Sequence, residues 1–202
     1  MPAAKGKQRR TQRERTEATT SRLLEAARSL FARDGYAATS LDAVVAKCGV
    51  TKGAFYHHFS GKEELFRAVF EAEVERGFAA VSQAGARKRD AVSAGYEGFK
   101  AYLDFSLEPG VQRITLIDAP GVLGWEVMRA VDARYSLRLV KETLRHGMGS
   151  GQIARRDVDA LAHILFGAML EAALFVARAE DQQSARRKVL RKIRMIFESL
   201  RA

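Results

Sequence analysis

Two adjacent histidines, His57 and His58, follow Tyr56 in the stretch VTKGAFYHHFSGKEEL at residues 50–65. Imidazole and phenol side chains can bind metals, transfer protons or donate hydrogen bonds. Neighbouring side chains on a helix point about 100° apart, so the two imidazoles cannot converge on one metal ion. The sequence contains no H-E-x-x-H, C-x-x-C, Walker or G-x-S-x-G motif. We therefore expect no metal, no cofactor and no enzyme activity.

The residues around this stretch indicate two short helices joined by a tight turn. Segment 41–48 (LDAVVAKC) places its apolar residues on one helical face, and Gly49 ends it. Thr51 can cap a second helix over about 52–59. Two short helices joined through a glycine are typical of a DNA-binding helix-turn-helix, which we place at residues 40–59.

The second helix of such a unit must present one face to its own core and the other to the major groove. On a helical wheel, Phe55 and Phe59 fall together on the inner face, with His58 beside them. The outward face consists of small, aromatic and hydrogen-bonding residues, namely Gly53, Tyr56 and His57, with Lys52 at its boundary. Such a face suits contacts with base edges.

Other residues around the helix-turn-helix suit contacts with phosphates. The backbone N–H groups near Ser40 and Thr51 lie at expected helix N-termini, where anions bind favourably. Lys62 begins the next helix and can neutralise a phosphate, and the basic arm over residues 1–18 can follow the DNA backbone.

Positive charge is concentrated near the N-terminus. The chain has 202 residues and a formal net charge of +10, and residues 1–62 contain twelve Lys or Arg and five Asp or Glu, a net of +7. Residues 63–202 contribute only +3. This asymmetry predicts a polyanionic partner for the first third of the chain. Cys48 is the only cysteine, which fits a reducing, cytoplasmic location.

Helical periodicity extends over the rest of the chain. Gly35 is expected to end a helix that begins at Thr19, and Ser60 to open a long helix that reaches about residue 83. Further helices are expected at about 92–107, 111–118, 122–147, 158–179 and 184–200. The segment RITLI (113–117) is the only strand candidate. We predict an all-α fold with a flexible basic arm over 1–18, a helix-turn-helix domain over 19–66 and a larger helical domain over 67–202.

The run ALAHILFGAMLEAALFVA (160–177) is long and apolar enough to raise the alternative of a membrane span. His163, Gly167 and Glu171 interrupt it, and an intramembrane carboxylate and imidazole would be costly. A buried helix is the preferred interpretation, so no membrane partner is expected.

The segment TTSRLLEAARSLFARDGYAATSLDAVVAKCGVTKGAFYHHFSGKEELFRAVFE (19–71) resembles the N-terminal DNA-binding domain of the tetracycline-repressor (TetR) family of bacterial regulators. It joins LF..DGY, T-S-L, A..G-V-T-K-G-A-F-Y-H-H-F and S-G-K-E-E-L in order and without a gap. The resemblance implies DNA contacts from Thr51, Lys52, Gly53, Ala54, Tyr56, His57 and His58, with phosphates held by Thr39, Ser40 and Lys62. It places His58 at the groove edge, whereas the helical wheel places this residue near the core.

The resemblance also implies a helical C-terminal domain that forms a homodimer through its last two long helices and encloses a small-molecule effector pocket. Segment RITLIDAPGVLGWEVMRAVDARY (113–135) further resembles a subgroup of these regulators that share an IDAP.VLGW motif. The candidate pocket residues are mostly apolar, with two polar contacts: Tyr96, Phe99, Leu103, Trp125, Met128, Phe166 and Met169, with His163 or Glu171. For each of them, ordinary core packing remains the alternative.

The expected function is that of a homodimeric, sequence-specific DNA-binding transcriptional regulator, a repressor released from a palindromic operator by a small-molecule effector. Its expected partners are double-stranded DNA, a second copy of the chain and an effector of unknown identity. The alternative is a ligand-independent, architectural DNA-binding protein whose second domain only dimerises. A dimer would read half-sites about 34 Å apart, or a multiple of that distance.

Overall fold

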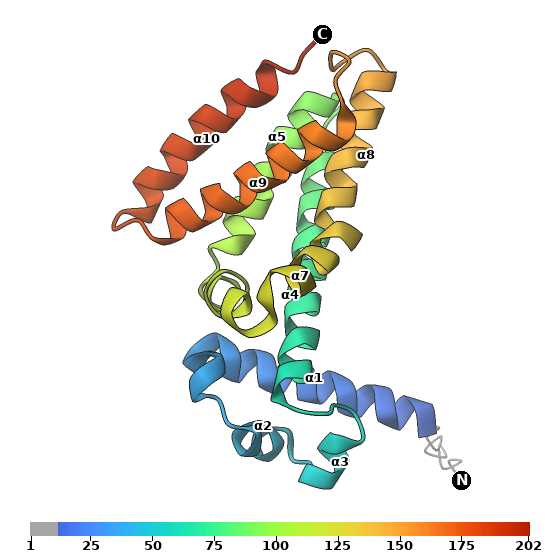
Figure 1. The fold of residues 1–202 in the computed structure, drawn as a ribbon, viewed down its shortest axis with the longest axis vertical. Helices are drawn as coiled ribbons and strands as arrows, with labels where there is room; N and C mark the ends of the chain where they lie inside the picture. The colour runs from blue at the N-terminus through green and yellow to red at the C-terminus, as the bar shows by residue number, and fades with distance from the viewer. Residues whose placement is uncertain (1–11) are drawn as a thin grey trace, which may run out of the picture. The chain divides into compact units, whose positions relative to one another are not determined.

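The computed structural model describes residues 12–202. These residues form helices joined by turns and loops, and none of them forms a β-strand (Figure 1). The all-α prediction is confirmed. One isolated β-bridge joins Ile153 to Arg201. The chain divides into two compact units, with the boundary between Val69 and Phe70. Most of the expected basic arm, residues 1–11, lies outside the described residues.

The first unit contains α1 (Gln12–Ala38), α2 (Leu41–Cys48), α3 (Lys52–Tyr56) and the first residues of α4 (Lys62–Ala86). Helix α1 begins at Gln12, seven residues before the expected start at Thr19, so part of the segment expected as an arm is helical. Segment 12–18 lacks apolar periodicity, but it carries an (i, i+4) ion pair of 2.8 Å between Arg13 and Glu17 that suits a polar helical surface. Gly35 interrupts α1 with φ 81°, as expected of a glycine that ends a regular helix.

Aromatic side chains fill the core of the first unit. The rings of Phe31 and Phe66 meet edge to face with centroids 5.1 Å apart, and Tyr36 contacts Phe66 in the same manner at 5.0 Å. Such pairs stabilise a core beyond the apolar area that they bury. Leu23 and Val44 are fully buried with them. This core holds α1, α2 and the start of α4 together.

The second unit consists of the remaining part of α4 and six further α-helices with one π-helix: α5 (Ala91–Ser106), α6 (Pro109–Val111), η1 (Gln112–Asp118), α7 (Ala119–Arg134), α8 (Ser136–Gly149), α9 (Val158–Ala177) and α10 (Gln182–Glu198). The strand candidate RITLI lies in the π-helix η1. The single helix expected over 122–147 is two helices, because the backbone breaks at Tyr135. The Tyr135 ring packs against Phe78 of α4, a contact that local periodicity cannot reveal.

The core of the second unit surrounds α9, which packs against α5, α8 and α10 (Figure 1). Asp157 caps α9 as expected, since its carboxylate accepts a hydrogen bond from the Ala160 N–H at 2.7 Å. Gly147 lets α8 approach its neighbours closely. A Cβ atom at Gly147 would lie 2.5 Å from Ile153 and 2.8 Å from Ala91, so any larger residue there would force these elements apart.

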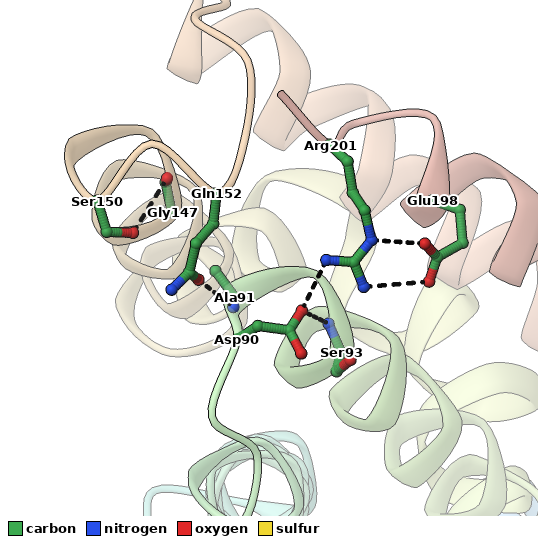
Figure 2. Close-up of polar contacts among 8 residues, drawn as sticks. All are labelled: Asp90, Ala91, Ser93, Gly147, Ser150, Gln152, Glu198 and Arg201. Atoms are coloured by element: carbon green, nitrogen blue, oxygen red, sulfur yellow. Dashed lines mark hydrogen bonds and ion pairs between the residues drawn. The ribbon is translucent and has the colours of Figure 1, made fainter.

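A polar cluster ties the C-terminus to the start of α5 (Figure 2). Asp90 caps α5 by accepting from the Ser93 N–H at 2.9 Å, and Arg201 reaches the same carboxylate at 3.2 Å. Arg201 also pairs with Glu198 at 2.6 Å. The Gln152 side chain accepts a hydrogen bond from the Ala91 N–H at 2.7 Å. Hydrogen bonds from Ser93, together with the positive charge of Arg201, hold the pKa of Asp90 below its ordinary value.

Replacing Asp90 with alanine should lower the free energy of unfolding by about 1–2 kcal/mol, because α5 loses its N-cap. Asp90→Asn keeps an oxygen that can cap the helix and removes only the charge that faces Arg201, so its loss should be smaller, below about 1 kcal/mol. Urea unfolding followed by circular dichroism measures both variants. Equal losses would contradict the assignment of the main effect to capping.

Candidate nucleic-acid interface and interior cavity

The caps of α2 and α3 fix the geometry of the helix-turn-helix. Ser40 accepts a hydrogen bond from the Ala43 N–H at 3.1 Å and caps α2. Gly49 ends α2 in the left-handed region at φ 69°, where residues with a Cβ are strained. Thr51 accepts from the Ala54 N–H at 3.1 Å and caps α3. These local interactions set the turn that the glycine position predicted.

Helix α3 has one buried face and one exposed face. Phe55 is completely buried and Phe59 nearly so, which confirms the inner face of the helical wheel. The Tyr56 ring stands edge to face against Phe55, with centroids 5.3 Å apart, yet 57% of the residue is exposed. Gly53 and His57 are exposed beside it. Helix α3 ends at Tyr56, three residues before the expected end.

Gly53 is not required by the packing of the first unit. A Cβ atom built there would meet only the Thr51 hydroxyl at 3.9 Å, an ordinary contact distance. Glycine inside a helix is about 1 kcal/mol less favourable than alanine. No contact within the unit therefore requires a glycine at position 53. The lack of a side chain there leaves the backbone exposed near Tyr56.

Lys52 and His58 both contact neighbouring helices. The Lys52 ammonium lies 2.6 Å from the Asp42 carboxylate of α2, and this hydrogen bond raises the pKa of Lys52. His58 is half-buried, and its Nδ1 lies 3.0 Å from the Thr20 hydroxyl of α1. His58 therefore lies where the helical wheel places it, against its own unit.

Two of the expected phosphate contacts hold the end of α1 instead. Thr39 is 2% exposed, and its hydroxyl donates to the Gly35 carbonyl at 2.7 Å. A buried hydroxyl that already donates its proton cannot donate it to a phosphate, so Thr39 is withdrawn from the candidate contacts. Lys62 donates to the carbonyls of Tyr36 and Thr39, each at 3.0 Å, and lies 4.1 Å from the Tyr36 ring centroid. An ammonium has three N–H donors, so one is left for an external acceptor.

The second unit encloses a largely apolar cavity of about 230 Å³. Six phenylalanines contribute to its wall: Phe70, Phe78, Phe99, Phe105, Phe166 and Phe197. Of the candidate pocket residues, Phe99, Met128, Phe166 and Met169 line this cavity. Its wall comes from α4, α5, the π-helix η1 and α7 to α10, together with the loop at Ile153, so most of the second unit contributes to it.

The other five candidates do not line the cavity. Leu103 is fully buried in the core, and Tyr96 lies 4.6 Å from the Arg194 guanidinium. Trp125 is 61% exposed, while His163 and Glu171 lie on the exposed face of α9. The sequence of α9 did not show that these two residues face outward, because the helix is apolar around most of its circumference. His163 and Glu171 therefore cannot act as polar contacts within the cavity.

Several polar groups in the cavity wall were missed. Asp132 is one of them. Burial raises the pKa of its carboxyl to about 6, although the positive charge of Arg129 acts to lower it. Burial and the neighbouring Asp132 also raise the pKa of Tyr102. The Ser82 hydroxyl is buried and has no hydrogen-bond partner among the described residues. One sequence signal was available, since Asp132 follows Met128 by four residues and so shares its apolar helical face.

Exposed apolar side chains gather on α9 and α10, which lie side by side (Figure 1). Ile164 and Phe175 are 68% and 55% exposed on α9, and Met195 and Ile196 are 61% and 43% exposed on α10. Of the helices described, only α9 is long and apolar enough to cross a membrane, a property that core helices of soluble proteins share. Burying this apolar face would remove a large hydrophobic surface from water.

Residues 92–200 match the family model for the tetracyclin repressor-like C-terminal domain, and residues 23–69 match that for bacterial regulatory proteins of the tetR family. The chain belongs to the TetR family. The resemblance seen in the sequence is thereby confirmed, and this TetR-family chain is a DNA-binding transcriptional regulator. Its helix-turn-helix is the DNA-binding part of the matched family, and the cavity lies within the matched C-terminal region.

Known proteins resemble this TetR-family regulator along most of its length. The TetC protein of transposon Tn10 from Escherichia coli is 28% identical, covering 84% of this chain and 86% of TetC. The transcriptional regulator SrpR of Pseudomonas putida is 29% identical, with 83% and 79% covered. A TetR-family regulator from Pectobacterium atrosepticum has a solved structure with a TM-score of 0.82 and 30% identity, covering 96% of this chain and 98% of its own. RolR, solved in complex with resorcinol, shares the fold at a TM-score of 0.68 and 22% identity, with 92% and 96% covered.

Asp132→Asn should raise the free energy of unfolding at pH 8 and leave it almost unchanged at pH 4. The pKa of Asp132 is about 6 in the folded chain, against an ordinary value of 3.8. The unfolded chain therefore loses this proton first, and wild-type stability falls between pH 4 and pH 6 and then levels off. The asparagine variant escapes that loss, which we put at about 1–2 kcal/mol after allowing for water in the cavity.

Chemical unfolding at one-unit pH intervals measures this difference. Glu171→Gln removes a carboxylate from the exposed face of α9 and serves as the control, with no such pH-dependent gain expected. A gain for Asp132→Asn that is the same at every pH would contradict burial as the cause.

Proposed function

We propose that this regulator is a homodimeric repressor that binds a near-palindromic DNA operator and is released by a small molecule in the cavity. The exposed face of α3 carries the proposal, because its residue types, its exposure and its anchoring by Phe55 suit insertion into a major groove. The DNA contacts are assigned to the exposed or half-exposed members of the expected set: Ser40, Thr51, Lys52, Gly53, Ala54, Tyr56, His57, His58 and Lys62. DNA as the partner makes the cytoplasm the expected location.

Each of the central residues has a distinct role in this proposal. Gly53 allows close approach of the DNA, since nothing within the unit occupies the space of its missing side chain. Tyr56 presents a hydroxyl and a ring edge that Phe55 holds in place. His57 is exposed next to it and can donate or accept a hydrogen bond. The net charge of +7 over residues 1–62 favours the approach of a polyanion.

The apolar face of α9 and α10 supports the assignment of a homodimer. Ile164, Phe175, Met195 and Ile196 are large, apolar and exposed on two adjacent helices. A two-fold axis beside these helices would pair them with the same helices of a second copy, as isologous interfaces do. The pairing would form a four-helix contact and bury the surplus apolar surface of α9.

The interior cavity supports release by an effector over the architectural alternative. A domain that serves only to dimerise gains nothing from an apolar cavity, since a cavity in a core lowers stability. The cavity wall also contains Asp132, whose pKa is raised by burial, and the Ser82 hydroxyl, which has no hydrogen-bond partner among the described residues. RolR, which shares the fold, has been solved with the small aromatic molecule resorcinol as its ligand. A ligand that binds the DNA-free form more tightly lowers DNA affinity by linkage.

Selection of bound fragments from a random DNA pool tests the proposal and supplies the operator. The recovered sequences should be inverted repeats whose half-sites are centred about 34 Å apart or a multiple of that distance. Recovery of fragments without any shared sequence would favour the architectural alternative. The affinity of the wild type should also fall steeply with salt.

Tyr56→Ala should weaken binding to the selected operator by about 10- to 100-fold, which corresponds to losing one specific base contact. Its affinity for unrelated DNA should stay close to that of the wild type, because phosphate contacts are kept. Fluorescence anisotropy with labelled duplexes measures both affinities. Arg155→Ala removes an exposed cation from the second unit and is the control. Unchanged operator affinity for Tyr56→Ala would overturn the role of α3.

Phe175→Glu should convert the dimer into a monomer, because the pairing of α9 and α10 would bury an unpaired charge at a penalty of several kcal/mol. Sedimentation velocity measures the oligomeric state. Ile117→Glu makes the same kind of change at a site of equal exposure, 55%, on the π-helix, so it should remain dimeric. Dissociation of both variants, or of neither, would argue against this dimer face.

A further inference from the structure

The ionisable acidic and basic residues that line the cavity are all acidic. The wall contains two carboxylates, Glu73 and Asp132, and none of its lining residues is a lysine, arginine or histidine. The rest of the lining is apolar, aromatic or neutral and polar. A ligand with a carboxylate or phosphate would therefore meet like charges and no cationic partner. This asymmetry makes the cavity electrostatically less favourable for an anion than for a cation.

Glu73 is compensated from within the protein. It is 1% exposed, and the Arg76 guanidinium pairs with its carboxylate one helical turn along α4. The same guanidinium lies 5.2 Å from the Phe105 ring centroid and 3.6 Å from Glu108. The Glu73 charge thus has its countercharge in place, and it places no demand on a ligand.

Asp132 has no such partner. Its carboxylate makes no hydrogen bond or ion pair with any residue of the described range 12–202. The nearest compensating charge is Arg129, one turn earlier on α7. The Arg129 guanidinium lies over two rings instead, 5.1 Å from the Trp125 centroid and 5.4 Å from that of Phe166. Burial without a countercharge disfavours the ionised carboxylate, so the site gains from any cation that enters.

The aromatic wall suits a cation as well. Six phenylalanines and Tyr102 line the same space, and aromatic faces attract ammonium groups through their quadrupole. The Tyr102 phenol also titrates with difficulty, since burial and Asp132 raise its pKa. It therefore stays neutral and adds no second negative charge.

We propose that the cavity binds a small organic monocation, an amine or quaternary ammonium on an apolar or aromatic body, with Asp132 as the counter-ion. The proposal rests on the proposed function in one respect, because it treats the cavity as the effector site. A cavity of about 150 Å³ holds benzene in another protein, so 230 Å³ admits a body somewhat larger than one ring. A neutral hydroxylated ring can also donate a hydrogen bond to Asp132, but it leaves the carboxylate charge without a countercharge.

The test uses three probes with a phenyl ring and equal numbers of non-hydrogen atoms. Benzyltrimethylammonium is the cation, neopentylbenzene its neutral isostere and 3-phenylpropionate the anion. Isothermal titration calorimetry at pH 8, with the full-length protein, should show the cation binding at least about tenfold more tightly than either other probe. Binding of the neutral or anionic probe as tightly as the cation, or no cation binding at millimolar concentration, would overturn the proposal.

Asp132→Asn provides the matched variant. It should lower the affinity for benzyltrimethylammonium by about tenfold or more and leave the affinity for neopentylbenzene unchanged. This variant is expected to be more stable than the wild type at pH 8, so a loss of binding cannot be attributed to unfolding. Glu171→Gln removes an exposed carboxylate outside the cavity and should bind as the wild type does. Equal loss of affinity for the cation and the neutral probe would assign Asp132 a structural role only.

Titrating the same probes into the complex with the selected operator separates this inference from the proposed function. Release of DNA by the neutral or anionic probe, with no response to the cation, keeps the effector site and rejects the cationic ligand. Cation binding that depends on Asp132 but leaves the DNA complex intact supports the ligand class and rejects effector release.

Discussion

The proposed DNA-binding face of α3 depends on the burial of one side chain, Phe55. Helix α3 has only five residues, far too few to form a stable helix in water by hydrogen bonding alone. Phe55 fixes it by packing with no exposed surface against its own unit, and Phe59 extends the contact. The orientation of Tyr56 follows, because its ring leans on Phe55. The outward residues are therefore positioned before any DNA arrives, which limits the entropy lost on binding.

The features that could be predicted from the sequence are set by near neighbours in the chain. Gly49, Ser40 and the inner pair Phe55 and Phe59 follow from caps and periodicity, which act over a few residues. The roles of Thr39 and Lys62 were not predictable in this way. Lys62 binds a carbonyl 26 residues earlier, at Tyr36. Only the closed three-dimensional unit shows that these polar groups are already engaged.

The cavity residues also divide into those that the sequence predicts and those that only the tertiary structure shows. Phe99 of α5, Met128 of α7, and Phe166 and Met169 of α9 lie in the cavity wall as expected, because apolar side chains tend to be buried. Trp125 was expected there too, but it is 61% exposed. The polar contacts were wrong, since His163 and Glu171 lie outside while Asp132 lies in the wall. A polar residue on a mostly apolar helix has no comparable tendency to be buried or exposed that its sequence position reveals. Which polar residues are buried depends on how several helices pack around the cavity, and residues from most of the second unit line it.

In the proposed DNA complex, Asp42 competes with DNA for the Lys52 ammonium, because the two residues form an ion pair in the free protein. Before binding, the Lys52 ammonium is neutralised by a carboxylate of the preceding helix. In the proposed complex, a phosphate or base that binds Lys52 shares its ammonium with Asp42, since an ammonium has three N–H donors, and the Asp42 carboxylate then lies close to a polyanion. A loosely bound duplex gains little from Lys52, because the Asp42 carboxylate already offsets the charge of its ammonium. In the proposed complex, only a duplex that also makes the neighbouring contacts offsets the repulsion from Asp42, so this carboxylate would favour specific over non-specific binding.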